Sequence, residues 1–153
     1  MISYLKQTCR LFSKMRQKFY LDTAIWRDYY EDRSDNSKQL GKLALRFLIK
    51  IIKENSLILF SDLIVRELMA KYSKEEIIDI LAIFHNLNLL VKVPISQEQA
   101  NEAADLHKEK GIPFGDALHA ILSRDNKAVM VTRDKHFKRL INIAGFKKPE
   151  DLL

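Results

Sequence analysis

The stretch that decides the fold reads GIPFGDALHAILSRDNKAVMVTRDKHFKRL and spans residues 111–140. It predicts a helix from Asp116 to about Arg124, a short apolar strand over Ala128–Val131, and a long helix over Asp134–Ala144. A turn containing glycine and proline precedes the first of these helices. A strand enclosed by two helices in this way is typical of proteins built from βαβ units around a parallel sheet.

The rest of the chain continues the same alternation of helices and strands. Leu40–Asn55 carries an apolar stripe with helical spacing, and Ser73 with Glu76 forms a capping box at the start of another helix. Ser61 or Asp62 can cap the helix that carries Glu67. Further strands are expected at Lys18–Leu21, Leu57–Phe60 and Leu89–Val93, and further helices at residues 73–86 and at residues 96–110, the latter stopped by Gly111. These elements predict an α/β fold.

The composition fits one globular domain. The chain has 153 residues, of which 47% are hydrophobic and 30% charged, so it is too apolar for a disordered protein. The single cysteine, Cys9, cannot form an internal disulfide. We find no apolar run near the ~20 residues of a membrane helix and no secretory signal. We therefore expect a cytoplasmic protein without stable membrane association.

The positive charge is concentrated at the amino terminus. Five basic residues and no acid occur in the first 18 residues, and they account for all but about one unit of the net charge of +6. We interpret residues 1–17 as a basic extension outside the folded domain, and residues 18–153 as the domain. A basic protein often binds nucleic acid, but here the charge says little about the domain itself.

Acidic residues follow the predicted strands. Asp22 and Asp134 come directly after strands, and Glu67 follows a strand by one to two helical turns. In open parallel sheets, ligands bind beyond the carboxyl ends of the strands, so these acids are expected at one edge. Asp116 joins them if its helix packs alongside. Two carboxylates ~4 Å apart repel by about 4 kcal/mol at an effective dielectric of about 20, so a cluster of four favours bound Mg²⁺ or Mn²⁺.

Each acid also has an ordinary structural interpretation. Asp116 and Asp134 can be helix caps and nothing more. Glu67 can form an ion pair with a nearby lysine or arginine. Asp22 is harder to explain in that way, since it stands between apolar residues and is poorly solvated. The polar segment 27–39 is too polar for the core and is expected to be a loop or an exposed helix start. The prediction of a site therefore depends on the four acids together.

From about Lys18 onward the chain resembles the PIN-domain nucleases. KFYLDTAIW (residues 18–26) resembles the first strand of that family with its leading Asp, and SDLIVRELM (residues 61–69) resembles the motif with a helical Glu. The most specific likeness is the stretch 111–140, which resembles a helix-opening Asp followed, after one strand, by Thr-x-Asp and a Phe. KKPEDLL (residues 147–153) resembles the closing segment. The matching residues of the long stretch are Asp116, Thr132, Asp134 and Phe137.

This resemblance implies a three-layer α/β/α fold with a central parallel sheet of four to five strands. It also implies hydrolysis of RNA by a Mg²⁺- or Mn²⁺-dependent endoribonuclease, with Thr132 beside the site. Many members are toxins of VapC-type toxin–antitoxin pairs, often dimeric, so an antitoxin partner and a homodimer through residues 40–84 are expected. The departures are the basic extension and the added acids Asp28, Glu31 and Asp32, which can crowd or cover the site. The catalytic and metal-binding residues implied are Asp22, Glu67, Asp116 and Asp134, with Thr132 as a further catalytic residue.

Several alternatives remain open. LDTAI is similar to the haloacid-dehalogenase phosphatases, but Ala24 stands where they need a second Asp. His119 and His136 follow Asp116 and Asp134 closely, yet packed or surface histidines are more common than metal ligands. A housekeeping RNA-processing nuclease and a catalytically inactive PIN-like module that binds RNA or protein are the main rivals to a toxin. The presence of all four acids favours an active enzyme.

Overall fold

A five-stranded sheet with all neighbouring strands parallel forms the centre of the computed structural model, which describes residues 15–153. The strand order is β3-β2-β1-β4-β5, so the first strand of the chain lies in the middle. This confirms the predicted α/β fold with a parallel sheet of four to five strands. The strands are β1 (Lys18–Leu21), β2 (Leu57–Phe60), β3 (Leu90–Lys92), β4 (Val129–Val131) and β5 (Phe146–Lys147).

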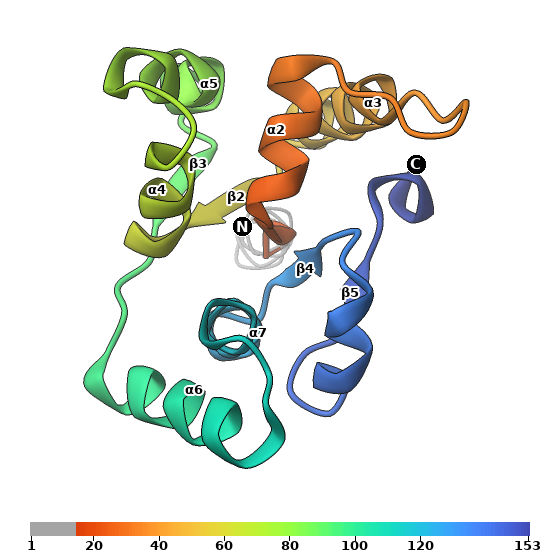
Figure 1. Ribbon diagram of the computed structural model, residues 1–153. Helices are drawn as coiled ribbons and strands as arrows, with labels where there is room; N and C mark the ends of the chain where they lie inside the picture. Colours follow the sequence, from red (N-terminus) through yellow and green to blue (C-terminus); the bar gives the residue numbers. More distant parts are fainter. Residues whose placement is uncertain (1–14) are drawn as a thin grey trace, which may run out of the picture.

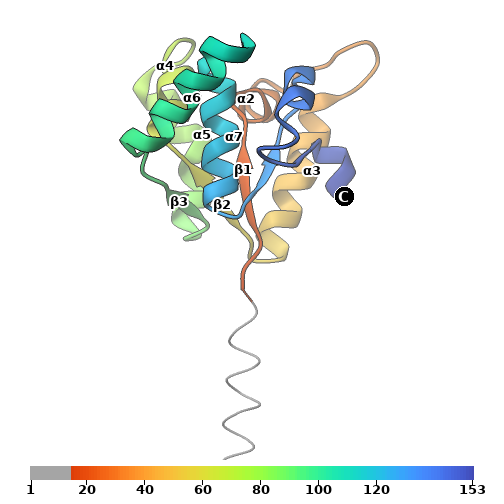
Figure 2. The same cartoon turned by 90° about the horizontal axis from the view of Figure 1, so that it is seen from below.

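Helices cover both faces of this sheet. Figure 1 shows α2, α3 and α5 above the sheet and α6 and α7 below it, which makes three layers. In Figure 2, α7 crosses in front of the sheet next to β1, with α6 packed on its outer side. The helices are α2 (Thr23–Glu31), α3 (Leu40–Lys53), α4 (Asp62–Met69), α5 (Lys74–Asn86), α6 (Gln97–Lys110) and α7 (Phe114–Asp125), followed by the 3₁₀ helices η1 (Lys135–Leu140) and η2 (Pro149–Leu152).

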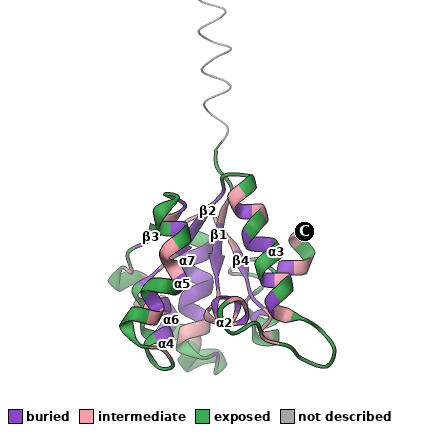
Figure 3. Ribbon diagram, turned by 90° about the horizontal axis from the view of Figure 1, so that it is seen from above, coloured by how far each residue is buried: buried purple, intermediate pink, exposed green. Residues whose placement is uncertain are grey.

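The core lies between the sheet and these helices. Figure 3 shows β1, β2 and β4 mostly buried, with exposed residues on the outer sides of the helices. The edge strands β3 and β5 are partly exposed. A parallel sheet covered on both faces needs strands that are largely apolar, and β1 has this character from Phe19 to Leu21. Phe19 of β1 packs edge-on against Phe47 of α3, with 5.1 Å between ring centroids. Trp26 of α2 contacts Phe84 of α5 in the same way at 5.6 Å.

The helix boundaries agree with the capping signals in the sequence. Ser73 with Glu76 forms the predicted capping box at the start of α5. Gly111 ends α6 in the left-handed conformation, with φ of 65°, which explains why a glycine stands there. Ser61 precedes α4, but its side chain makes no capping bond. Within residues 15–153, we find no helix with the length and apolar character to cross a membrane.

The predicted long helix over Asp134–Ala144 is wrong. The structure has only the 3₁₀ helix η1 over Lys135–Leu140, after which the chain turns into β5. Phe137 and Leu140 are both buried and stand three residues apart. This spacing places them on the same side of a 3₁₀ helix, which has three residues per turn. The apolar spacing therefore did indicate a helix, but a 3₁₀ helix instead of an α-helix.

The segment 27–39 also differs from the prediction. Its first residues complete α2, which extends to Glu31, and the remainder is a loop closed by a bridge between Asp35 and Lys38. The segment was expected to lie outside the core, yet Asp28 is only 1% exposed. Its burial is explained by Arg133, whose Nε donates a hydrogen bond to Asp28 Oδ2 at 3.1 Å.

Candidate functional site

The carboxyl ends of β1 and β4 lie side by side at the point where the order of strands across the sheet reverses. The chain passes from β1 to β2 and β3 on one side, and then returns to β4 on the other side of β1 (Figure 1). Crevices at such switch points are the usual ligand sites of open parallel sheets. Asp22 follows β1 and Thr132 follows β4, and the Thr132 hydroxyl donates a hydrogen bond to Asp22 Oδ2 at 2.8 Å.

The turn after β4 fixes the position of Asp134. The backbone N–H of Asp134 donates to the Thr132 hydroxyl oxygen at 3.1 Å, so Thr132 connects two of the predicted acids. Asp134 also caps η1, because its Oδ1 accepts the backbone N–H of His136 at 2.8 Å. The capping interpretation of Asp134 is therefore confirmed, and it does not exclude a role in the site.

Asp116 lies in the first turn of α7, among the other acids. The cap position of this helix is Pro113, so the alternative interpretation of Asp116 as the helix cap is wrong. Burial raises the pKa of Asp116 to about 6, and the carboxylates of Asp134 and Asp22 contribute to the rise. The Asp116 carboxylate is therefore close enough to both to be destabilised by their charge.

Glu67 enters the site from α4. Its carboxylate accepts hydrogen bonds from the hydroxyl of Thr23 and from Nε2 of His119, the latter at 3.0 and 3.1 Å. Burial alone would raise the pKa of Glu67, but the bonds from His119 and Thr23 outweigh it and hold this pKa below its usual value. The expected partner, a lysine or arginine, is replaced by a histidine and a threonine.

His119 is packed, as the ordinary interpretation expected, but it also contacts the predicted site. Its side chain is 1% exposed on the buried face of α7. Its second ring nitrogen, Nδ1, lies 2.9 Å from the hydroxyl of Tyr20, which in turn lies 2.7 Å from the hydroxyl of Ser61. A chain of hydrogen bonds thus runs from β1 and the end of β2 to Glu67.

The donor atoms of the site fit a divalent cation. One ligand atom each from Asp22, Glu67 and His119 lie within 4.8 Å of one another, and the same holds for Asp116, Asp134 and His136. Burial raises the pKa of Asp22, while His119 and the bond from Thr132 oppose this rise. Half-buried carboxylates that raise one another's pKa are stabilised by a hard cation with oxygen ligands.

Sequence reasoning missed several residues around the acids. Tyr20 and Thr23 gave no signal beyond their places at or next to a strand end, and Ser61 was considered only as a helix cap. Two of the three added acids, Asp28 and Glu31, have charged or polar partners of their own. Asp28 pairs with Arg133 and with Arg33, the latter at 3.4 Å. Glu31, the last residue of α2, accepts a hydrogen bond from the hydroxyl of Tyr72 at 2.7 Å.

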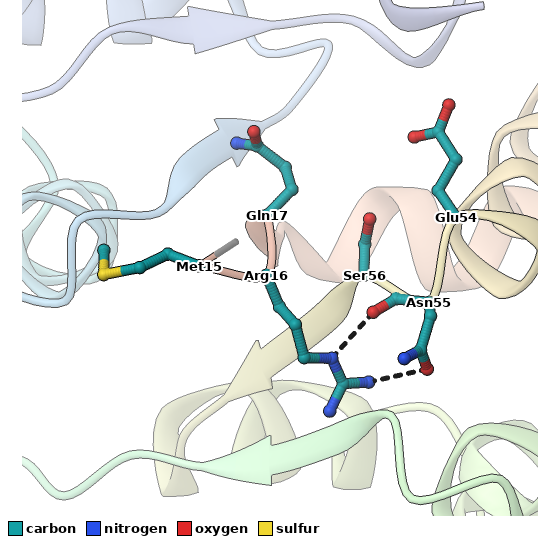
Figure 4. Close-up of a pocket in the computed structure, with 6 residues that line it drawn as sticks. All are labelled: Met15, Arg16, Gln17, Glu54, Asn55 and Ser56. Carbon is teal, nitrogen blue, oxygen red and sulfur yellow. Dashed lines mark hydrogen bonds between the residues drawn. The ribbon is translucent and has the colours of Figure 1, made fainter. Parts of the chain in front are cut away.

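A large pocket of about 640 Å³ lies at the opposite end of β1 from Asp22. Figure 4 shows Arg16 at this pocket, donating to the backbone oxygen and the side-chain oxygen of Asn55 at 2.7 and 2.9 Å. Size does not identify this pocket as the site, since the clustered acids lie at the carboxyl ends of the strands. The predicted boundary between residues 17 and 18 stays a prediction, and residues 1–14 lie outside the described chain. The pocket is lined by Met15, Arg16, Gln17, Glu54, Asn55 and Ser56.

The comparisons with known proteins agree with this fold. Residues 19–142 match the PIN domain family, so the chain belongs to that family, whose members are generally nucleases. The fold is similar to VapBC2 from Rickettsia felis bound to a DNA fragment from its promoter, with 23% identity, a TM-score of 0.62, and coverage of 86% of this chain and 98% of that chain.

Two further solved structures share the fold. A toxin–antitoxin complex from Klebsiella pneumoniae is 20% identical with a TM-score of 0.57, and the match covers 86% of this chain and 97% of that chain. FitAcB from Neisseria gonorrhoeae is 20% identical with a TM-score of 0.55, covering 86% and 98%. No curated protein is a significant match to the chain.

Proposed function

We propose that this protein is a metal-dependent endoribonuclease whose site consists of Asp22, Glu67, Asp116 and Asp134, with Thr132 beside them. The observation that carries the proposal is geometric: candidate ligand atoms of Asp116 and Asp134 lie within 4.8 Å of each other, and so do those of Asp22 and Glu67. Carboxylates this close repel one another, and a divalent cation with oxygen ligands relieves that repulsion. Membership of the PIN family supports phosphodiester hydrolysis as the reaction.

The side chains of the site divide into those that hold a cation and those that position them. A bound Mg²⁺ or Mn²⁺ lowers the pKa of a coordinated water and neutralises charge on the leaving oxygen. Thr132 fixes one oxygen of Asp22 by donating to it at 2.8 Å. His119 and Thr23 together contact both oxygens of Glu67. These carboxylates are thus held in fixed orientations, as a preorganised site requires.

The test compares two aspartates of the same chain. Asp116→Asn removes one charge from the proposed site, whereas Asp105→Asn removes a charge from an exposed position on α6. We expect Asp116→Asn to reduce RNA cleavage in Mg²⁺ or Mn²⁺ by orders of magnitude and Asp105→Asn to leave it unchanged. Equal cleavage by both variants would overturn the proposed site. Both proteins are checked for folding by circular dichroism.

The solved relatives support a toxin over a housekeeping nuclease. One is a toxin–antitoxin complex and another is VapBC2, so a protein partner that suppresses cleavage is the matching proposal for this chain. Purification from the native host tests it. A small bound protein whose removal raises nuclease activity supports the toxin. Active protein that purifies alone supports the housekeeping enzyme, and folded protein without activity supports an inactive binding module.

A homodimer is the second part of this proposal. Helix α5 buries Ile77, Ile80 and Phe84 but leaves Ile78 59% and Ile83 46% exposed. Large apolar side chains left exposed on a helix favour contact with another surface. We expect a dimer in sedimentation at micromolar concentration and a folded monomer after Ile78→Asp. A wild-type monomer under the same conditions would contradict this expectation.

A further inference from the structure

His136 stands beside the two acids at the carboxyl end of β4. Its Nδ1 lies 3.3 Å from Asp134 Oδ1 and 3.9 Å from Asp116 Oδ2. Its side chain is 65% exposed, whereas those of Asp134 and Asp116 are 37% and 21% exposed. We propose that His136 is a nitrogen ligand of the divalent cation held by Asp116 and Asp134, an inference that rests on the proposed function and makes its donor set more specific.

The distances agree with three ligands of one ion. Ligands about 2.2 Å from an octahedral ion lie about 3.1 Å apart when adjacent and about 4.4 Å apart when opposite. The two separations from His136 Nδ1, 3.3 and 3.9 Å, fall within this range. The candidate ligand atoms of all three residues lie within 4.8 Å of one another. Small side-chain movements are therefore sufficient to complete the contact.

The backbone already directs His136 toward this position. The N–H of His136 donates to Asp134 Oδ1 at 2.8 Å, so the start of η1 holds the residue next to the carboxylate. No further hydrogen bond or ion pair of its ring, apart from those to the two acids, occurs within residues 15–153. The ring nitrogen is therefore available to an ion that the acids attract.

The other histidine of the site is not available in this way. Both ring nitrogens of His119 are engaged, Nε2 with Glu67 at 3.0 Å and Nδ1 with the Tyr20 hydroxyl at 2.9 Å. Coordination by His119 would require the loss of one of these buried hydrogen bonds, which is costly. His119 therefore positions Glu67. Of the two histidines, His136 is the one whose ring nitrogen can coordinate the ion.

A nitrogen ligand affects the choice of metal. Imidazole is a good ligand for first-row transition ions, whereas Mg²⁺ takes oxygen ligands almost exclusively. The site of this chain should therefore favour a transition ion over Mg²⁺ more strongly than a site made of carboxylates alone. Mn²⁺ has the weakest preference for nitrogen in that series. The loss of affinity measured with Mn²⁺ when the histidine is removed is therefore a lower limit for the other transition ions.

The experiment measures Mn²⁺ binding directly, without cleavage. The full chain is titrated with Mn²⁺ and then with Mg²⁺ by calorimetry, and pulsed electron paramagnetic resonance detects nitrogen coordinated to Mn²⁺. We expect a nitrogen signal that His136→Ala removes and that His85→Ala, a change at an exposed histidine of α5, retains. His136→Ala should weaken Mn²⁺ binding about 10-fold and Mg²⁺ binding much less.

Asp116→Asn identifies the location of the ion, since it should weaken binding of both metals. A wild-type complex with Mn²⁺ but without a nitrogen signal would overturn the proposal, as would a signal that survives His136→Ala or the absence of Mn²⁺ binding. Because these readouts do not depend on RNA, Mn²⁺ binding through His136 in a protein that cleaves no RNA would refute the proposed function and leave this inference intact.

Discussion

Arg133 offers a quantitative test of how the turn at Thr132–Asp134 is held. Its side chain is 16% exposed, and it donates to Asp28 at 3.1 Å and to Glu150 of η2 at 2.8 Å. Asp28 belongs to α2, the helix that begins directly after Asp22. The ion pairs of Arg133 therefore connect the helix after one predicted acid to the turn that carries another.

The change Arg133→Met removes the main partner of a carboxylate that is 1% exposed. Breaking a buried ion pair by removing one side costs about 3–5 kcal/mol. Arg33 remains 3.4 Å from Asp28, so we expect the lower end, a loss of about 3 kcal/mol. At roughly 2–4 °C per kcal/mol for a chain of this size, Tm should fall by roughly 6–12 °C.

The assay is thermal and urea unfolding of this variant beside two others. Arg124→Met is the control, because Arg124 pairs with Glu102 at the surface with 36% of its side chain exposed, and such pairs contribute about 1 kcal/mol or less. The double variant Asp28→Asn with Arg133→Met should lose less stability than the sum of the single changes. A loss no larger than that of Arg124→Met, or strictly additive losses, would refute the reasoning.

Three further outcomes follow from the structure. The pKa of Asp116 is raised from 3.8 to about 6, so the stability that its protonated form gives the metal-free protein is fully present below about pH 4 and is lost as the pH rises through 6. The loss amounts to about 3 kcal/mol. In EDTA, Tm of the wild-type protein should therefore fall between pH 4 and 6, and this fall should be absent in Asp116→Asn. Mn²⁺ at about 100 times its Kd should stabilise the wild-type protein by about 2.7 kcal/mol and stabilise Asp22→Asn by less, which melting curves with and without Mn²⁺ will check. Ser73→Ala removes the capping box of α5 and should cost about 1 kcal/mol in urea unfolding, and a change below about 0.3 kcal/mol would show that the cap contributes little.

The central strands β1, β2 and β4 were predictable because their burial on both faces requires apolar runs. Leu57–Phe60 was predicted to the residue, and Leu89–Val93 contains β3 with one extra residue at each end. Helices with strong local signals, such as the capping box at Ser73, were equally clear. The two-residue strand β5 and the 3₁₀ helix η1 were missed or misassigned, since they depend on packing against elements that are distant in sequence.

The candidate site was predictable where it follows from topology. Asp22 and Thr132 come together because parallel neighbouring strands end at the same edge. The contact of His119 with Glu67 joins residues 52 positions apart, and nothing local in either helix indicates it. The burial of Asp28 has the same cause, since its partner Arg133 lies 105 positions away. Pairings between charged groups on different elements need the three-dimensional structure.

The most direct test of the central claim is the metal dependence of RNA cleavage and the chemistry of the ends it leaves. The full chain is freed of metal with EDTA, incubated with RNA, and then supplied with Mg²⁺ or Mn²⁺. We predict no cleavage in EDTA, recovery with the cation, and products without 2′,3′-cyclic phosphate, because a cation held by the four acids would activate water as the nucleophile in place of the 2′-hydroxyl. Cleavage that persists in EDTA and leaves cyclic phosphate ends would contradict a site built on Asp22, Glu67, Asp116 and Asp134.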